Sequence, residues 1–195
     1  TALNTACSGD TDVVATGTYY ENIIVSKDVV IIRGNSATTS TSVIIDGGWR
    51  GDVITVRNTS SFTLEGLTIQ NATWGENAPS GKAGISIDAS TRGSFTLRNL
   101  MVRKNGFGIV VKNSRNGAVI LERNLIAENI YDGIAGNTIG SPEIRMVNNT
   151  IARNGQSGYA DGAAGGSRIF KNNINAQNGW YGVFPHEGSG RFMSY

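Results

Sequence analysis

A short phrase that recurs between residues 83 and 183 constrains the fold more than any other feature of this sequence. Each copy holds a glycine followed by an aliphatic or aromatic residue, and successive glycines lie 24, 25, 25 and 24 residues apart. Two asparagine series keep steps of 24 or 25 residues. A period of this length indicates stacked supersecondary units. The glycines are Gly84, Gly108, Gly133, Gly158 and Gly182, and the asparagines are Asn99, Asn124, Asn149 and Asn173 in one series and Asn105, Asn129, Asn154 and Asn178 in the other.

The content of each unit predicts its secondary structure. Short apolar stretches such as residues 85–87, 95–97 and 100–102 are separated by Gly, Asn, Ser and Arg, and no segment carries the 3.6-residue periodicity of an amphipathic helix. Three short strands per turn, each pairing with its equivalent one turn later, make a parallel β-helix. We therefore predict an all-β solenoid of about seven rungs, a rod on the order of 30 Å tall at roughly 4.8 Å per rung.

This repeat resembles the right-handed parallel β-helix of the pectate lyase superfamily, and the opening stretches 9–14, 17–25 and 29–34 resemble the first rungs of pectin-esterase-like proteins. The resemblance implies the fold. It leaves the function open, because the scaffold hosts lyases, hydrolases, esterases, epimerases, adhesins and structural stalks.

We expect one β-helix domain over residues 1–195. Residues 1–12 are interpreted as the remnant of an N-terminal cap with a short helix, because an open solenoid end exposes unpaired strand edges. The first full turn is placed at residues 23–25, 29–32 and 43–45. Residues 72–82 are predicted to be an inserted loop, and residues 180–195 the C-terminal rung.

Turn residues and charges complete the expected scaffold. The asparagines are predicted to occupy tight corners and to hydrogen-bond to one another from rung to rung. Arg103, Glu128 and Arg153 are predicted to be equivalent on three successive rungs, as a ladder of alternating charge.

Composition excludes several classes of protein. The net charge is +2 and the basic residues are dispersed, so a nucleic-acid-binding surface is not expected. No apolar run approaches the length of a membrane span. The single cysteine, Cys7, cannot form an internal disulfide. Low charge, abundant Asn, Ser, Thr and Gly, and the resemblance together favour a secreted or cell-surface protein.

Candidate catalytic residues lie near the last rungs. The positions three and four residues after the repeat glycines hold Asp161 and His186. His186 is the only histidine of the chain, and histidine is the residue type suited to general acid or base catalysis near neutral pH. Residues 181–187 resemble a motif of alginate C5-epimerases, which implies proton transfer at a uronate C5 by Tyr181 and His186. Phe184 stands where that family has aspartate, which argues against epimerase activity.

Other sites of the superfamily are not found in the sequence. Pectin esterases need two aspartates and an arginine on neighbouring central rungs, and calcium-dependent lyases need clustered carboxylates. Neither pattern is present, so we predict no metal and no cofactor.

Carbohydrate contacts are expected from exposed aromatic and charged side chains. Trp74, Trp180, Lys112 and Asp88 are the candidates, although aromatic residues near the last rung could instead close the apolar column. Three sequons, at Asn58, Asn71 and Asn148, are possible glycosylation sites.

Two functional hypotheses remain. In the first, a secreted β-helix binds or acts on an acidic polysaccharide, as a polysaccharide lyase or uronate-epimerase-like enzyme with Tyr181, His186 and Asp161 as its catalytic residues. In the second, a non-catalytic structural or adhesive module stacks end to end into filaments, because head-to-tail contacts between two different ends do not close.

Overall fold

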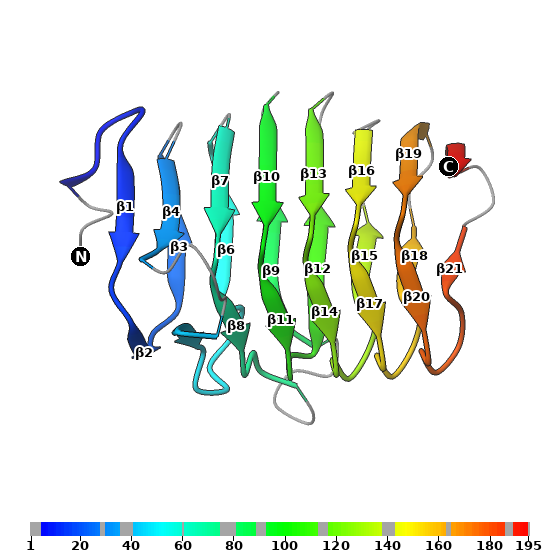
Figure 1. The fold of residues 1–195 in the computed structure, drawn as a ribbon, viewed down its shortest axis with the longest axis horizontal. Coiled ribbons are helices and arrows are strands. Elements are labelled where there is room, and N and C mark those ends of the chain that lie inside the picture. Colours follow the sequence, from blue (N-terminus) through cyan, green and yellow to red (C-terminus); the bar gives the residue numbers. More distant parts are fainter. Residues whose placement is uncertain are drawn as a thin grey trace.

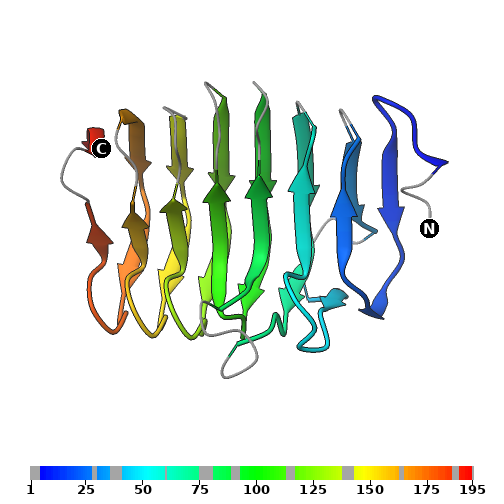
Figure 2. The same ribbon diagram turned by 180° about the vertical axis from the view of Figure 1, so that it is seen from behind.

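A computed structural model describes residues 5–27, 30–35, 41–59, 61–74, 81–88, 93–112, 117–137, 143–162, 165–185 and 189–194. Within these ranges the chain is a rod of stacked rungs, with its two ends at opposite ends of the long axis (Figure 1 and, from behind, Figure 2). The described strands form three parallel sheets of eight, seven and seven strands, which we call sheets A, B and C. Seven rungs each contribute one strand to every sheet, and an eighth strand of sheet A follows them. The predicted parallel β-helix is confirmed.

The strand bounds show how regular the repeat is. Sheet A consists of β1 (Thr11–Val14), β4 (Val30–Gly34), β7 (Ser61–Glu65), β10 (Ser94–Arg98), β13 (Ala118–Glu122), β16 (Glu143–Val147), β19 (Gly165–Lys171) and β22 (Ser189–Ser194). Sheet B consists of β2 (Gly17–Tyr20), β5 (Val43–Asp46), β8 (Thr68–Gln70), β11 (Met101–Arg103), β14 (Leu125–Ala127), β17 (Thr150–Ala152) and β20 (Ile174–Ala176). Sheet C consists of β3 (Ile23–Val25), β6 (Ile54–Arg57), β9 (Ala83–Asp88), β12 (Phe107–Lys112), β15 (Ile134–Asn137), β18 (Tyr159–Asp161) and β21 (Val183–Phe184).

The core is a column of apolar side chains inside the three sheets. In sheet A, Phe62 lies beside Phe95 in register and Leu64 beside Leu97, and all four are at most 2% exposed. Alternate residues of each strand point inward because successive side chains of a strand face opposite sides. Stacked identical or similar apolar residues therefore fill the interior from rung to rung.

Two corners of each rung from the third to the seventh have a left-handed backbone. Between sheets A and B, and again between B and C, one residue per rung has a φ of 52° to 69°. Non-glycine residues rarely adopt this conformation, and asparagine tolerates it best. The first corner holds Gly66, Asn99, Arg123, Asn148 and Asn172, and the second holds Asn71, Lys104, Glu128, Arg153 and Gln177.

Two buried asparagine ladders follow these corner residues. The side-chain amide of Asn129 donates to Oδ1 of Asn154 at 2.9 Å, and Asn129 Oδ1 accepts from the backbone N–H of Asn105 at 3.2 Å. The same pattern links Asn105 to Asn129 and Asn154 to Asn178. The predicted ladder of this series is therefore present, and it satisfies backbone donors that the tight corners leave unpaired.

The second ladder corrects one prediction. Its side chains run from Asn124 to Asn149 and Asn173. Asn99 is not part of it, because the register aligns Met101 with Leu125 and so places Asn99 beside Arg123 at the exposed corner. Leu100 takes the ladder position and donates its N–H to Asn124 Oδ1 at 3.0 Å.

The repeat glycines make room for the ladders. A Cβ on Gly133 would lie 2.7 Å from Nδ2 of Asn154 and 2.8 Å from the Gly158 carbonyl oxygen. Real Cβ atoms do not approach other atoms this closely, so any larger residue at position 133 would force its neighbours to shift. The repeat glycines and the asparagine series that begins at Asn105 therefore recur with the same period because they pack against each other.

Four further predictions differ from the structure or fall partly outside the described residues. The first rung starts at Thr11, earlier than the expected turn at residue 23, because the half-exposed strands β1 and β2 carry a weak apolar pattern. The charge ladder contains Lys104 instead of Arg103, since Arg103 aligns with Ala127. Residues 1–4 of the expected cap lie outside the described ranges. Residues 72–74 and 81–82 of the predicted insertion contain no strand, and residues 75–80 lie outside the described ranges. In the part of the chain that the structure describes, no helix is long and apolar enough to cross a membrane.

Candidate functional site

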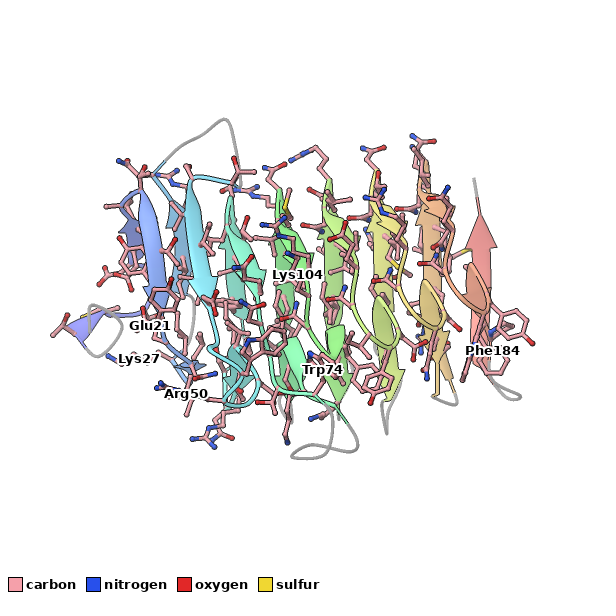
Figure 3. The ribbon with its side chains drawn as sticks, turned by 90° about the horizontal axis from the view of Figure 1, so that it is seen from below. Glu21, Lys27, Arg50, Trp74, Lys104 and Phe184 are labelled. Atoms are coloured by element: carbon pink, nitrogen blue, oxygen red, sulfur yellow. The ribbon has the colours of Figure 1, made fainter. Side chains whose placement is uncertain are left out.

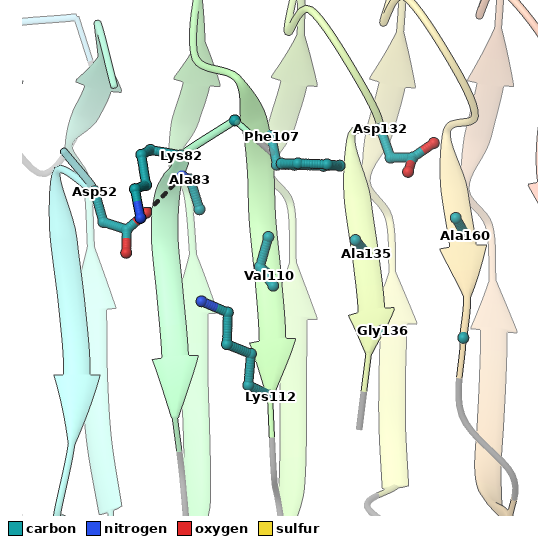
Figure 4. A pocket seen from close by; sticks show the side chains of 12 residues that line it. Asp52, Lys82, Ala83, Phe107, Val110, Lys112, Asp132, Ala135, Gly136 and Ala160 are labelled. Carbon is teal, nitrogen blue, oxygen red and sulfur yellow. Dashed lines mark hydrogen bonds between the residues drawn. The ribbon is translucent and has the colours of Figure 1, made fainter. Parts of the chain in front are cut away.

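A groove of about 390 Å³ runs over the outer face of sheet C, across strands β9, β12, β15 and β18 (Figure 4). Its lining residues are Asp52, Gly81, Lys82, Ala83, Phe107, Val110, Lys112, Asp132, Ala135, Gly136, Ala160 and Gly162. The groove crosses several rungs, so its length follows the axis of the rod.

The floor of the groove is low because the side chains that form it are small. Val110 aligns with Ser86 on one side and Ala135 on the other, and Ala135 aligns with Ala160. These residues form one outward-facing row of sheet C. Larger side chains, Phe107 and Lys112, lie at the two ends of the same strand β12, so the floor is bordered by an aromatic side and a basic side.

Two aromatic rings form the first border. The rings of Phe107 and Tyr131 lie 5.0 Å apart with an angle of 31° between their planes. Gly81 packs against them in a left-handed conformation with φ of 64°, and a Cβ there would lie 2.6 Å from the Tyr131 ring. Gly81 thus lets the chain pass close to the ring pair and fixes its position.

The charged lining residues have different surroundings. Lys112 is exposed, and Lys82 and Asp52 lie toward the other end of the groove from Asp132 (Figure 4). Asp52 Oδ1 accepts the backbone N–H of Ala83 at 2.7 Å, which holds the loop before β6 against β9. Two lysines, Lys82 and Lys112, and two carboxylates, Asp52 and Asp132, therefore line the groove.

Asp132 is the carboxylate with the most unusual environment in the groove. It is 9% exposed, and its Oδ1 accepts the Ser157 backbone N–H at 2.8 Å. Burial raises the pKa of the Asp132 carboxyl above its usual range, although hydrogen bonds from Ser157 oppose this effect. A carboxyl with a raised pKa in a groove is a candidate for proton transfer or for pH-dependent binding.

Asp161, predicted as a catalytic residue, lies inside the solenoid. The register aligns it with Gly136, and Gly136 in turn aligns with the buried Val111. Its carboxylate is 1% exposed and accepts hydrogen bonds from Nε and Nη2 of Arg168 at 3.0 and 3.1 Å. A polymer in the groove does not reach this side chain.

A buried polar cluster therefore interrupts the apolar column. Arg168 Nε also donates to the Tyr159 hydroxyl at 2.8 Å, and both Arg168 and Tyr159 are 0% exposed. Burial raises the pKa of Tyr159 well above its usual range. Gly136 leaves the space that the cluster occupies, since a Cβ there would lie 3.2 Å from the Tyr159 hydroxyl. Neither Arg168 nor this cluster was predicted from the sequence.

The other predicted catalytic residues lie near the last rung. Tyr181 is 54% exposed and stacks on Phe184 with centroids 5.1 Å apart. It follows Asp132 and Ser157 in one row along sheet C, as the register of β15, β18 and β21 shows. His186 lies outside the described residues.

The predicted binding residues are distributed over two surfaces. Lys112 lines the groove, and Asp88, whose side chain lies outside the described part, aligns with it in register. Trp74 and Trp180 are 45% and 65% exposed and lie outside the groove lining.

The three sequon asparagines differ in accessibility. Asn58 and Asn148 are exposed. The side-chain amide of Asn71, in contrast, donates to Asp46 Oδ2 at 2.7 Å.

Several lining residues were missed at the level of sequence. Asp132 directly precedes a repeat glycine, and Phe107, Ser157 and Tyr181 hold the same place in their rungs. A comparison of the residues that directly precede the repeat glycines would have identified Asp132. Lys82 had no such signal, because it ends the predicted insertion. Among the described residues, no group of three or more His, Cys, Asp or Glu side chains could hold a metal ion.

Three parallel sheets wound around one apolar column, with a groove along an outer face, define the parallel β-helix class. A family model described as a right handed beta helix region matches residues 28–192, and the chain belongs to this family. A search of curated proteins finds no match.

Two solved structures similar to this chain are pectin methylesterases. One, in complex with a hexasaccharide, is 12% identical with a TM-score of 0.62, and the match covers 100% of this chain and 82% of that chain. The other, from Aspergillus niger in penultimately deglycosylated form, is 15% identical with a TM-score of 0.59, and the match covers 100% and 80%. At these identities the likeness shows the fold alone.

Proposed function

We propose that this protein binds an acidic polysaccharide along the groove of sheet C. The observation that carries the proposal is the groove itself, which combines a floor of small side chains, the Phe107–Tyr131 ring pair and two lysines, Lys82 and Lys112. Sugar rings offer apolar C–H faces to aromatic rings, and carboxylates of uronate units would be attracted to the lysines.

The shape of the groove supports a polymer rather than a compact ligand. It crosses four successive strands of sheet C, so its long direction follows the stacking axis. One similar structure holds a hexasaccharide, which is consistent with an oligosaccharide on this scaffold. A secreted or cell-surface location belongs to the same proposal, because such polymers lie outside cells.

The enzymatic form of the proposal is a lyase or epimerase-like reaction on uronate units. Tyr181 and His186 are its proposed proton-transfer residues. Asp132, rather than the buried Asp161, is the carboxylate that a bound chain could reach, because Asp132 lines the groove in the same row as Tyr181.

Calorimetric titration with oligomers of pectate, alginate and a neutral glucan tests binding. Lys112→Ala should weaken binding of the acidic oligomers about tenfold, which corresponds to about 1.4 kcal/mol. Lys171→Ala is the matched control, because Lys171 is an exposed lysine on sheet A. Equal binding of acidic and neutral oligomers, or no binding of any, contradicts the proposal.

Assays for reducing sugars and unsaturated uronates on the same polymers test the enzymatic form. Product formation that is lost in Tyr181→Phe or His186→Ala supports it. Complete inactivity with intact binding restricts the protein to a binding role.

A second function, end-to-end association, is favoured by one observation. Large apolar side chains are exposed on the seventh rung, namely Ile174 at 61%, Trp180 at 65%, Tyr181 at 54%, Val183 at 37% and Phe184 at 44%. Contacts between unlike ends would give open filaments. Light scattering at rising concentration tests this, and a species that stays monomeric at all concentrations argues against it.

A further inference from the structure

Two exposed tryptophans form a ledge beside the groove. Trp49 and Trp74 are 48% and 45% exposed, and their ring centroids lie 6.1 Å apart with the planes at 77°. They belong to residues 47–52 and 71–74, at the corner between sheets B and C. We call these two segments the tryptophan ledge. Figure 3 shows Arg50, Trp74 and Phe184 along one long side of the rod.

Hydrogen bonds hold the ledge in place. Asp46, only 6% exposed, accepts the Gly48 N–H at 2.9 Å and the Asn71 side-chain amide at 2.7 Å, so it ties both segments together. The Trp49 N–H donates to the Asn71 carbonyl at 2.9 Å, and the Thr73 N–H donates to the Gly51 carbonyl at 3.1 Å. The aromatic rings are therefore presented from a fixed backbone.

Trp49 adopts an unfavourable backbone conformation. Its φ is 59°, in the left-handed region that bulky residues rarely occupy. The hydrogen bonds of the ledge impose this conformation, and its effect is to leave a large apolar ring half exposed. Strained residues that the surroundings hold in place are typical of binding sites.

The ledge is continuous with the groove. The Thr73 carbonyl accepts the Lys82 N–H at 2.8 Å, and Lys82 lines the groove. Asp52, which ends the first segment of the ledge, also lines the groove and accepts the Ala83 N–H. A chain that occupies the groove and continues toward the N-terminal rungs would meet the two tryptophans.

We infer that the tryptophan ledge is a sugar-binding subsite that stacks one pyranose ring of a polysaccharide extending beyond the groove. This inference rests on the proposed function and adds a second contact surface to it. Two rings at 77° form an angled corner that can hold one face and one edge of a sugar ring, whereas a flat protein or membrane contact needs a broader apolar patch. Arg50 and Asp52 flank the rings and can hydrogen-bond to hydroxyl groups.

The length of the oligosaccharide separates the ledge from the groove. A short acidic oligomer fits the groove alone, while a longer one also reaches the ledge. Trp74→Ala should therefore weaken binding of the long oligomer about tenfold and leave the short one unchanged. Trp74→Phe should restore most of the long-oligomer affinity, because it keeps an aromatic face. Lys112→Ala should weaken both oligomers.

Calorimetric titration of the full chain with a length series of one acidic oligosaccharide makes these comparisons. Val13→Ala, at an exposed apolar residue on sheet A, is the control and should bind both lengths like the wild-type protein. Circular dichroism of each variant confirms that it is folded. If Trp74→Ala is not folded, Trp74→Leu provides the test, because it keeps an apolar side chain without an aromatic face and should lose long-oligomer affinity.

The outcomes are distinguishable. If the wild-type protein binds acidic oligomers and Trp74→Ala binds the long oligomer equally well, the ledge inference is wrong and the proposed function stands. If no oligomer binds the wild-type protein, both fail. Trp74-dependent sedimentation with phosphatidylcholine and phosphatidylserine vesicles, without any effect of Trp74→Ala on the long oligomer, would assign the ledge to a lipid surface and overturn the inference.

Discussion

Arg168 donates to both carboxylate oxygens of Asp161, at 3.0 and 3.1 Å, inside the solenoid. Both side chains are fully enclosed, and the Tyr159 hydroxyl accepts a further hydrogen bond from Arg168. Two buried charges are tolerated only when they are paired and hydrogen-bonded. The pair is therefore a point at which single substitutions should be far more harmful than a joint replacement.

We predict that Arg168→Met lowers the free energy of unfolding by about 3–5 kcal/mol, because it leaves the Asp161 carboxylate buried without its partner. The double variant Arg168→Met with Asp161→Leu should recover most of this loss. Urea unfolding of the single and double variants measures the coupling. Additive losses in the double variant would contradict the prediction.

The asparagine ladder gives a second prediction. Asn129→Ala removes a side chain that bonds to both neighbouring rungs and leaves the buried Asn105 N–H without its acceptor. We expect a loss of about 3 kcal/mol of unfolding free energy. Asn99→Ala, at the half-buried left-handed corner, should lose only about 1 kcal/mol. Chemical denaturation of both variants measures the two losses of unfolding free energy. Equal losses would show that the ladder hydrogen bonds add no stability.

The repeat glycines provide the third prediction, with a control built into the chain. Gly133→Ala places a Cβ 2.7 Å from Asn154 Nδ2 and should destabilise the protein by about 1–3 kcal/mol. Gly182 occupies the same repeat position, but a Cβ there meets its nearest atom at 3.6 Å. Gly182→Ala should therefore leave the thermal midpoint nearly unchanged. A comparable loss in both variants would mean that glycine is required for the backbone and not for the ladder.

The sequence predicted the fold because each rung repeats the same packing contacts. The glycine and asparagine periods reflect backbone corners and side-chain ladders that depend mainly on neighbouring rungs, so they are visible without tertiary information. One ladder position was misassigned because Asn99, at the corner, lies one residue before Leu100, which takes the position that Asn124 holds one rung later.

The candidate site was harder to predict, since a groove depends on which residues are small. Asp161 shows the problem clearly. Its equivalents Ile87 and Val111 are apolar, which marks an inward position, yet the carboxyl group alone suggested a reactive surface residue. Arg168 could not be paired with it in advance, because its inward direction depends on the register of β19. The groove floor of Val110, Ala135 and Ala160 carries no chemical signal in the sequence.

Asp132 gives the final prediction, which concerns pH. Burial raises the pKa of its carboxyl in the folded protein above the ordinary value of 3.8. The folded state therefore binds this proton more tightly than the unfolded state. The stabilising contribution is fully present below pH 3.8 and is lost as the pH rises through the raised folded pKa. Above the raised folded pKa the wild-type protein thus contains a partly desolvated negative charge.

Asp132→Asn removes this charge and keeps a carbonyl oxygen that can accept the Ser157 N–H. At a pH above the folded pKa of Asp132 the variant should be more stable than the wild-type protein by on the order of 1 kcal/mol, and the difference should shrink as the pH falls toward 3.8. It should also bind acidic oligomers more tightly at neutral pH, because the groove loses a like charge. Asp132→Ala is the control, since it loses the acceptor as well and should be less stable than Asp132→Asn at every pH. Urea midpoints measured across this pH range test the prediction, and a stability difference between Asp132→Asn and the wild-type protein that does not change with pH would refute it.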